Sequence, residues 1–134
     1  MNNVKIFVGV IAILILGVIA TVILRAGPSS TVATPGQLDG FAQCLTDKGL
    51  IFYGAFWCPH CKAEKALFGT SARLLPYVEC SLPDAQHQTQ TCIDAKIMSY
   101  PTWRLKDGTD IPTEGYSGVS LATLATKSGC ALPK

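Results

Sequence analysis

The sequence contains no run of basic residues and no stretch in which aromatic and basic side chains alternate. It has 11 Lys and Arg against 9 Asp and Glu, which gives a formal net charge of +2. Lys5 and Arg25 flank an apolar N-terminal segment, so the chain beyond Arg25 is formally neutral. Because no basic patch is there to attract a phosphate backbone, we expect no nucleic-acid partner.

Charge is also missing from residues 6–24, an apolar stretch long enough to cross a hydrocarbon core of about 30 Å as a helix. We therefore predict a single N-terminal transmembrane anchor at residues 1–25. A cleavable signal peptide is the alternative, although its apolar region usually has about 7–15 residues. Residues 26–36 are rich in Gly, Pro, Ser and Thr and are predicted to be a linker. Residues 37–134 are then one folded domain.

The chain has 6 cysteines, which is unusual for a cytosolic domain of this size and normal for an exported one. This composition predicts that the N-terminus lies on the cytoplasmic or stromal side of a membrane. The domain would then lie on the periplasmic, otherwise extracytoplasmic, or lumenal side.

The spacing of apolar residues predicts an α/β domain around one mixed sheet. Leu38, Phe41 and Leu45 recur at helical spacing, and Gly49 marks the end of that helix. The other expected elements are a strand at 50–56, a helix from the first cysteine pair to 67, a strand at 77–79, a short helix at 93–98, a strand at 102–105, a return strand within 109–116, and a last helix capped by Ser120 and ended by Gly129.

The sequence Cys58-Pro59-His60-Cys61 lies between the predicted buried strand and the following helix. Pro59 suits the first turn of a helix, where a backbone N–H is not needed. A sulfur at that end meets free N–H groups and the positive end of the helix dipole, which favour a thiolate. We therefore predict that Cys58 is the nucleophile and that Cys61 resolves the mixed disulfide. His60 would further stabilise the thiolate and make the disulfide more oxidising.

A cysteine pair with this spacing has other possible roles. A zinc site needs a second cysteine pair or suitably spaced histidines, and Cys80, Cys92 and His87 do not supply that spacing. A purely structural disulfide across so small a loop would constrain little chain. Copper binding by the pair remains an alternative. We expect no metal and no cofactor.

Residues 56–62 resemble the active site of the thioredoxin superfamily, in which an aromatic residue precedes the nucleophile. The inner residues Pro59 and His60 match those of bacterial periplasmic thiol oxidases of the DsbA type. Residues 100–102 are similar to the cis-proline loop of the superfamily. The resemblance implies a thioredoxin-like fold, with Tyr100 and Pro101 facing the disulfide and contacting substrate.

A closer resemblance is to the thioredoxin-like domain that accompanies bacterial and plant vitamin K epoxide reductase homologues. It covers roughly residues 37–130 and rests on segments 53–61, 67–69, 75–80, 100–103 and 124–129. The resemblance implies that the domain oxidises exported protein thiols and passes electrons to a membrane reductase. Only one spanning segment is expected in this sequence, so a separate vitamin K epoxide reductase-like membrane partner is implied.

The chain departs from thioredoxins proper at Phe52, where they carry a buried acid, and this favours an oxidase. The resemblance also implies that Cys80 pairs with Cys92, either as a loop staple or as a redox relay to the first pair. Cys44 and Cys130 lie near the two ends of the domain, and either tie them together or leave a free thiol.

The predicted function is that of a membrane-anchored thiol–disulfide oxidase. An exported reductase or isomerase is the first alternative, and a copper-handling binding module is the second. Among the remaining residues, Trp57 is expected to be a lid beside the disulfide and a substrate contact. Trp103 and Tyr53 are expected in the core, and His87 in a solvated loop. Glu64 is expected to be an exposed helix charge, with assistance to proton transfer as the alternative.

Overall fold

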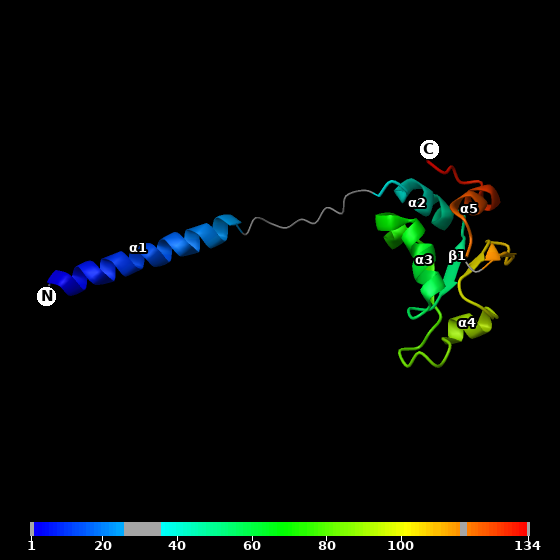
Figure 1. The fold of residues 1–134 in the computed structure, drawn as a ribbon, viewed down its shortest axis with the longest axis horizontal. Coiled ribbons are helices and arrows are strands. Elements are labelled where there is room, and N and C mark those ends of the chain that lie inside the picture. The colour runs from blue at the N-terminus through cyan, green and yellow to red at the C-terminus, as the bar shows by residue number, and fades with distance from the viewer. Residues whose placement is uncertain (1, 26–35, 116–117, 134) are drawn as a thin grey trace. The chain divides into compact units, whose positions relative to one another are not determined.

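The computed structural model describes residues 2–25, 36–115 and 118–133, and in the first range it describes side chains from 4 to 17. The chain divides into two units, Met1–Thr34 and Pro35–Lys134. In the first unit the helix α1 spans Asn2–Arg25 (Figure 1). Of the linker expected at 26–36, all but Gly36 lies outside the described residues.

Within the described part of the chain, no helix combines the length and the apolar character that crossing a membrane requires. The transmembrane helix expected at residues 6–24 is thus not found there. The side chains of residues 18–24, which belong to that prediction, lie outside the described residues.

The second unit is built on a four-stranded sheet with strand order β2-β1-β3-β4. The central strand β1 (Ile51–Gly54) runs parallel to β2 (Tyr77–Glu79) and antiparallel to β3 (Thr102–Arg104), which pairs antiparallel with β4 (Asp110–Ile111). The chain order after α1 is α2, β1, α3, η1, β2, α4, β3, β4, α5. This mixed α/β arrangement fits the thioredoxin-like fold that the resemblance implies.

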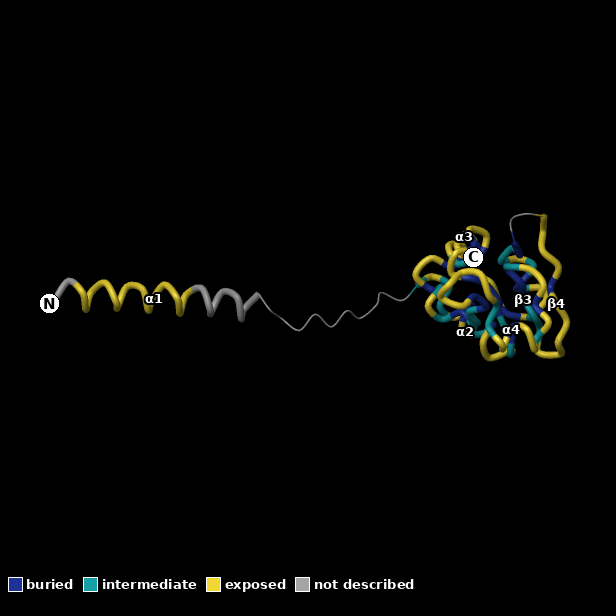
Figure 2. The backbone as a smooth tube through the Cα atoms, turned by 90° about the horizontal axis from the view of Figure 1, so that it is seen from below, coloured by how far each residue is buried: buried dark blue, intermediate teal, exposed yellow. Residues whose placement is uncertain are grey.

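Alternation along β1 divides the core between the two faces of the sheet. Phe52 belongs to the larger cluster and stacks on Trp103 at 4.7 Å between ring centroids. The neighbouring Tyr53 belongs to a second cluster with Cys80 and Cys92. Figure 2 shows the buried segments inside the second unit and the exposed ones along its loops. The prediction that Trp103 and Tyr53 are core residues is confirmed.

Local signals in the sequence explain where most helices begin and end. The helix α5 (Leu121–Ser128) is capped by Ser120, whose hydroxyl accepts the N–H of Thr123. It ends at Gly129, which takes the left-handed conformation with φ of 73°. The helix α2 (Asp39–Asp47) likewise ends before Gly49, which has φ of 74°. Both helices lie where the sequence predicts them.

The prediction is wrong for the short helix expected at 93–98. The helix α4 spans Gln90–Asp94 instead, and its cap residue is Thr89. The chain turns at Lys96, which has φ of 55°, and Ile97 is buried in the second cluster. The Cys80–Cys92 disulfide draws Cys92 inward, which a helical periodicity over so few residues does not reveal. The 3-10 helix η1 (Gly69–Leu74) was not expected either.

A disulfide between Cys44 and Cys130 joins α2 to the segment after α5. The two residues are separated by 86 positions in sequence, and their Cα atoms lie 5.9 Å apart. Cys130 belongs to the larger core cluster, and Cys44 packs against it. Of the two alternatives for these cysteines, the structure forms the tie between the ends of the domain.

Candidate active site

Cys58 and Cys61 are the two free cysteines of the chain, and they lie at the start of α3 (Pro59–Leu67). Cys58 is the cap residue of that helix, and its sulfur accepts the backbone N–H of Cys61 at 3.4 Å. Cys58 is 4% exposed and Cys61 is 1% exposed, while Pro59 and His60 between them are exposed. The buried strand β1 leads into this turn, so the cysteine pair lies at the end of the central strand.

The sulfur of Cys58 faces the loop before β3. It lies 3.9 Å from the backbone oxygen of Tyr100, and the peptide bond between Tyr100 and Pro101 is cis. Pro101 is buried, and Tyr100 is half-buried. The structure thus brings together Cys58 and the two residues that the resemblance assigns to substrate contact.

Cys61 is the more enclosed of the two thiols. A Cβ atom at Gly54 would come within 2.9 Å of its sulfur, so only glycine leaves room for it there. Burial raises the pKa of Cys61 to about 12, with a further contribution from the hydrogen bond to Cys58. A hydrogen bond with the backbone of Ala55 and, to a smaller extent, the charge of Lys65 act in the opposite direction and lower this pKa. Cys61 is therefore a protonated thiol at neutral pH when the pair is reduced.

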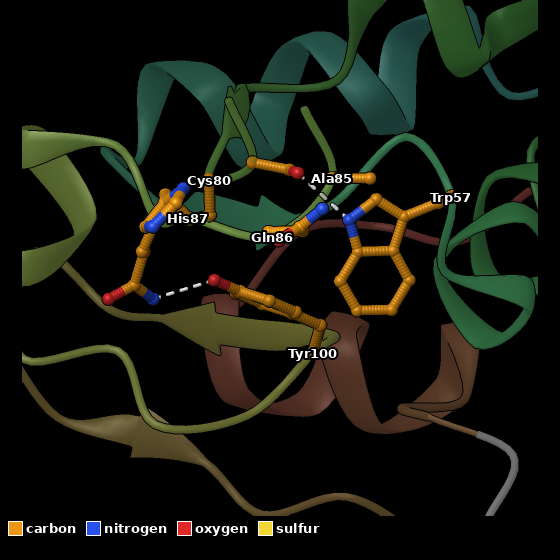
Figure 3. Close-up of a pocket in the computed structure, with 8 residues that line it drawn as sticks. Trp57, Cys80, Ala85, Gln86, His87 and Tyr100 are labelled. Carbon is orange, nitrogen blue, oxygen red and sulfur yellow. Dashed lines mark hydrogen bonds between the residues drawn. The ribbon is translucent and has the colours of Figure 1, made fainter. Parts of the chain in front are cut away.

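A pocket of about 130 Å³ opens beside the pair, between Trp57, Tyr100 and the loop at 81–88 (Figure 3). The rings of Trp57 and Tyr100 meet edge to face, with centroids 6.1 Å apart. The indole N–H of Trp57 donates to the hydroxyl of Ser81 at 2.8 Å, and the side-chain amide of Gln88 donates to the Tyr100 hydroxyl at 2.6 Å. The loop therefore holds both aromatic walls of this pocket in place.

The Cys80–Cys92 disulfide holds the two ends of that loop, and its Cα atoms are 5.5 Å apart. Both cysteines are fully buried and belong to the second core cluster, whereas Cys58 and Cys61 belong to the larger one. The Cys80–Cys92 disulfide is thus formed, as both the staple and the relay require. His87 at the tip of the loop is exposed and bonds Asp84, as expected for a solvated residue.

Glu64 is the clearest correction to the sequence analysis, which expected an exposed charge. Its side chain projects inward from α3 and is 0% exposed. It accepts the indole N–H of Trp103 at 2.9 Å and the backbone N–H of Val119 at 3.0 Å. Burial raises the pKa of this carboxyl. The sequence does contain a signal for this burial. Glu64 lies at helical spacing from Cys61 and Phe68, so all three share the inward face of the helix.

No protein-family model matches this sequence. A curated protein of Arabidopsis thaliana, thiol-disulfide oxidoreductase LTO1, is 39% identical over 97 residues, which cover 68% of this chain and 24% of that protein. The chain thus spans about a quarter of the length of the relative that it matches.

Proposed function

We propose that this protein is a thiol–disulfide oxidoreductase whose reactive pair is Cys58 and Cys61. The observation that carries the proposal is their placement: they are the two free cysteines, at the first turn of a helix, with the Cys58 sulfur facing the backbone oxygen of Tyr100. The similarity to a plant thiol-disulfide oxidoreductase supports the same conclusion. The other four cysteines are bound in disulfides.

In the oxidising direction, a substrate thiolate attacks the Cys58 sulfur of the oxidised pair. A disulfide forms between the substrate and Cys58, while the bond to Cys61 breaks and its electron pair leaves with the Cys61 sulfur, which then takes a proton. A second substrate thiolate attacks the substrate sulfur of the mixed disulfide, and Cys58 leaves as a thiolate. The backbone N–H of Cys61 and the positive, N-terminal end of α3 stabilise that thiolate.

The finer proposal is that the protein oxidises exported protein thiols and passes the electrons to a vitamin K epoxide reductase-like membrane protein. Two further disulfides within one small domain support an oxidising compartment. The uncharged residues 6–24 support an N-terminal anchor with the domain on the extracytoplasmic or lumenal side. An apolar Phe52 in place of a buried acid supports the oxidising direction.

The test is the redox potential of the Cys58–Cys61 pair in the 134-residue chain, measured by equilibration in glutathione buffers. Acid quenching and peptide mass spectrometry assign the reduced thiols to this pair and not to the two structural disulfides. We expect a value close to that of strong disulfide donors, about −120 mV. A value close to about −270 mV would refute the oxidase and leave a reductase for exported proteins.

A further inference from the structure

The Cys61 thiolate forms in an enclosed, apolar site. Its sulfur is buried beside Gly54 of β1. Phe52 of the same strand contributes a buried aromatic ring, which stacks on Trp103. Thiol exchange nevertheless requires this sulfur to carry a negative charge for part of each cycle, because the thiolate is the species that attacks and leaves. Some group near Cys61 must offset that charge.

Lys65 lies one helical turn after Cys61 on α3, so both side chains project from the same side of the helix. Its ammonium nitrogen is 3.2 Å from the centroid of the Tyr77 ring and is therefore held on the face of that ring. The ring itself borders Cys61: a Cβ atom at Gly54 would lie 2.9 Å from both the Cys61 sulfur and the Tyr77 Cε2 atom. The Tyr77 ring thus contacts the ammonium of Lys65 and also borders the enclosed sulfur of Cys61.

Other charged and titratable groups near Cys61 and Lys65 include Tyr77, Glu79 and Cys58. Tyr77 donates its hydroxyl to Glu79 at 2.7 Å, and burial raises the pKa of Tyr77, so it stays neutral. Glu79 also accepts the N–H of Phe56 and of Ser81. Burial lowers the pKa of Lys65, and the charges of Glu79 and Cys61 act against that shift. Cys58 raises the pKa of Cys61. Lys65 is the one described side chain whose charge lowers that pKa.

We propose that Lys65 is a positioning residue for thiol exchange, whose ammonium, held on the ring of Tyr77, stabilises the thiolate of Cys61. It acts through Cys61 and does not touch the substrate. The proposal rests on the proposed exchange at Cys58 and Cys61, but not on its direction.

The step that isolates this effect is the resolution of a mixed disulfide on Cys58. Cys61 loses its proton to solvent, and its thiolate attacks the Cys58 sulfur. The bond between Cys58 and Cys61 forms, the bond from Cys58 to glutathione breaks, and the electron pair leaves with glutathione, which takes a proton from solvent. The reverse step is the opening of the disulfide by an incoming thiolate, so Lys65 speeds both directions equally.

The experiment mixes the reduced 134-residue chain with excess oxidised glutathione, quenches samples in acid, and follows the glutathione adduct on Cys58 by mass spectrometry. In Lys65→Met we expect the pKa of Cys61 to rise, so that the rate of resolution lies below that of wild type at each pH from 7 to 9. The thiolate fraction then falls at neutral pH, while the nucleophilicity of the thiolate rises by part of the same factor. Resolution should therefore slow about threefold. The redox potential at pH 7 should not change, because Cys61 is a thiol at that pH with or without Lys65.

Two matched variants control for charge and for structure. Lys62→Met removes the same charge from an exposed position of the same helix and should leave the rate unchanged. Lys65→Arg keeps a cation that stacks on an aromatic face and should restore the rate to within about twofold. Tyr77→Leu keeps the lysine but removes the ring that holds it, and should slow resolution as Lys65→Met does.

A Lys65→Met chain with the rate and pH profile of Lys62→Met would overturn the inference. If Lys65→Met does not fold, Lys65→Gln is judged by the same criteria. Failure of the proposed function looks different: wild type would then form neither a glutathione adduct on Cys58 nor a Cys58–Cys61 disulfide. A reducing potential would refute the oxidase and leave the effect of Lys65 measurable.

Discussion

The first prediction concerns the buried carboxyl of Glu64, which connects α3 to two other segments of the domain. It links the helix that carries both cysteines to Trp103, two residues after Pro101, and to Val119 before α5. Replacing it by leucine leaves two buried N–H donors without an acceptor. Each such orphan costs about 1–3 kcal/mol, so Glu64→Leu should lower the free energy of unfolding by roughly 2–6 kcal/mol.

The pH dependence of stability provides a second, independent result. Burial raises the folded-state pKa of Glu64 above its ordinary value of 4.5. The folded chain therefore holds this proton after the unfolded chain has lost it. The stability that this group contributes is full below about pH 4.5 and is lost as the pH rises through the folded pKa. In Glu64→Gln, which does not titrate, that decline should disappear.

The assay is urea-induced unfolding of wild type and variants, repeated from pH 4 to pH 8, with Asp47→Asn as an exposed acidic control. The control should stay within about 0.5 kcal/mol of wild type. A Glu64→Leu chain within about 1 kcal/mol of wild type would show that the two N–H donors do not depend on this carboxyl. A Glu64→Gln chain with the same pH profile as wild type would refute the assignment of the pH effect to Glu64.

Two further predictions concern the disulfides and the aromatic wall of the pocket. Replacing Cys44 and Cys130 by alanine opens a loop of 86 residues and should lower the free energy of unfolding by about 4–5 kcal/mol, whereas replacing Cys80 and Cys92 opens a loop of 12 and should lower it by about 3 kcal/mol. Chemical unfolding measures both, and a reversed order would contradict the loop-entropy reasoning. Trp57→Phe keeps an aromatic ring but loses the N–H bond to the loop serine, worth about 0.5–1.5 kcal/mol, so the KM for a dithiol peptide should rise about two- to tenfold with kcat unchanged. An unchanged KM in steady-state assays would mean that this wall does not contribute to substrate binding.

Local patterns were sufficient to predict much of the second unit. The cysteine motif is predicted at the start of a helix because a buried strand precedes it and proline suits the first turn. Ser120 and Gly129 mark the two ends of α5 because their side chain and backbone freedom satisfy orphan groups within one turn. These signals depend on neighbouring residues alone, so a sequence is enough to read them.

Tertiary structure decided the features that depend on residues far apart in the chain. It buried Glu64, because two N–H donors from β3 and the segment before α5 meet over one face of α3. It shifted α4 toward Cys92, because the disulfide to Cys80 outweighs a weak periodicity. It also placed Lys65 on the ring of Tyr77, from the strand beside β1. The sequence by itself was enough to propose which sulfurs react, since a helix start and two thiols are local. The pKa of Cys61 is raised above all by burial, which exists only once the chain has folded.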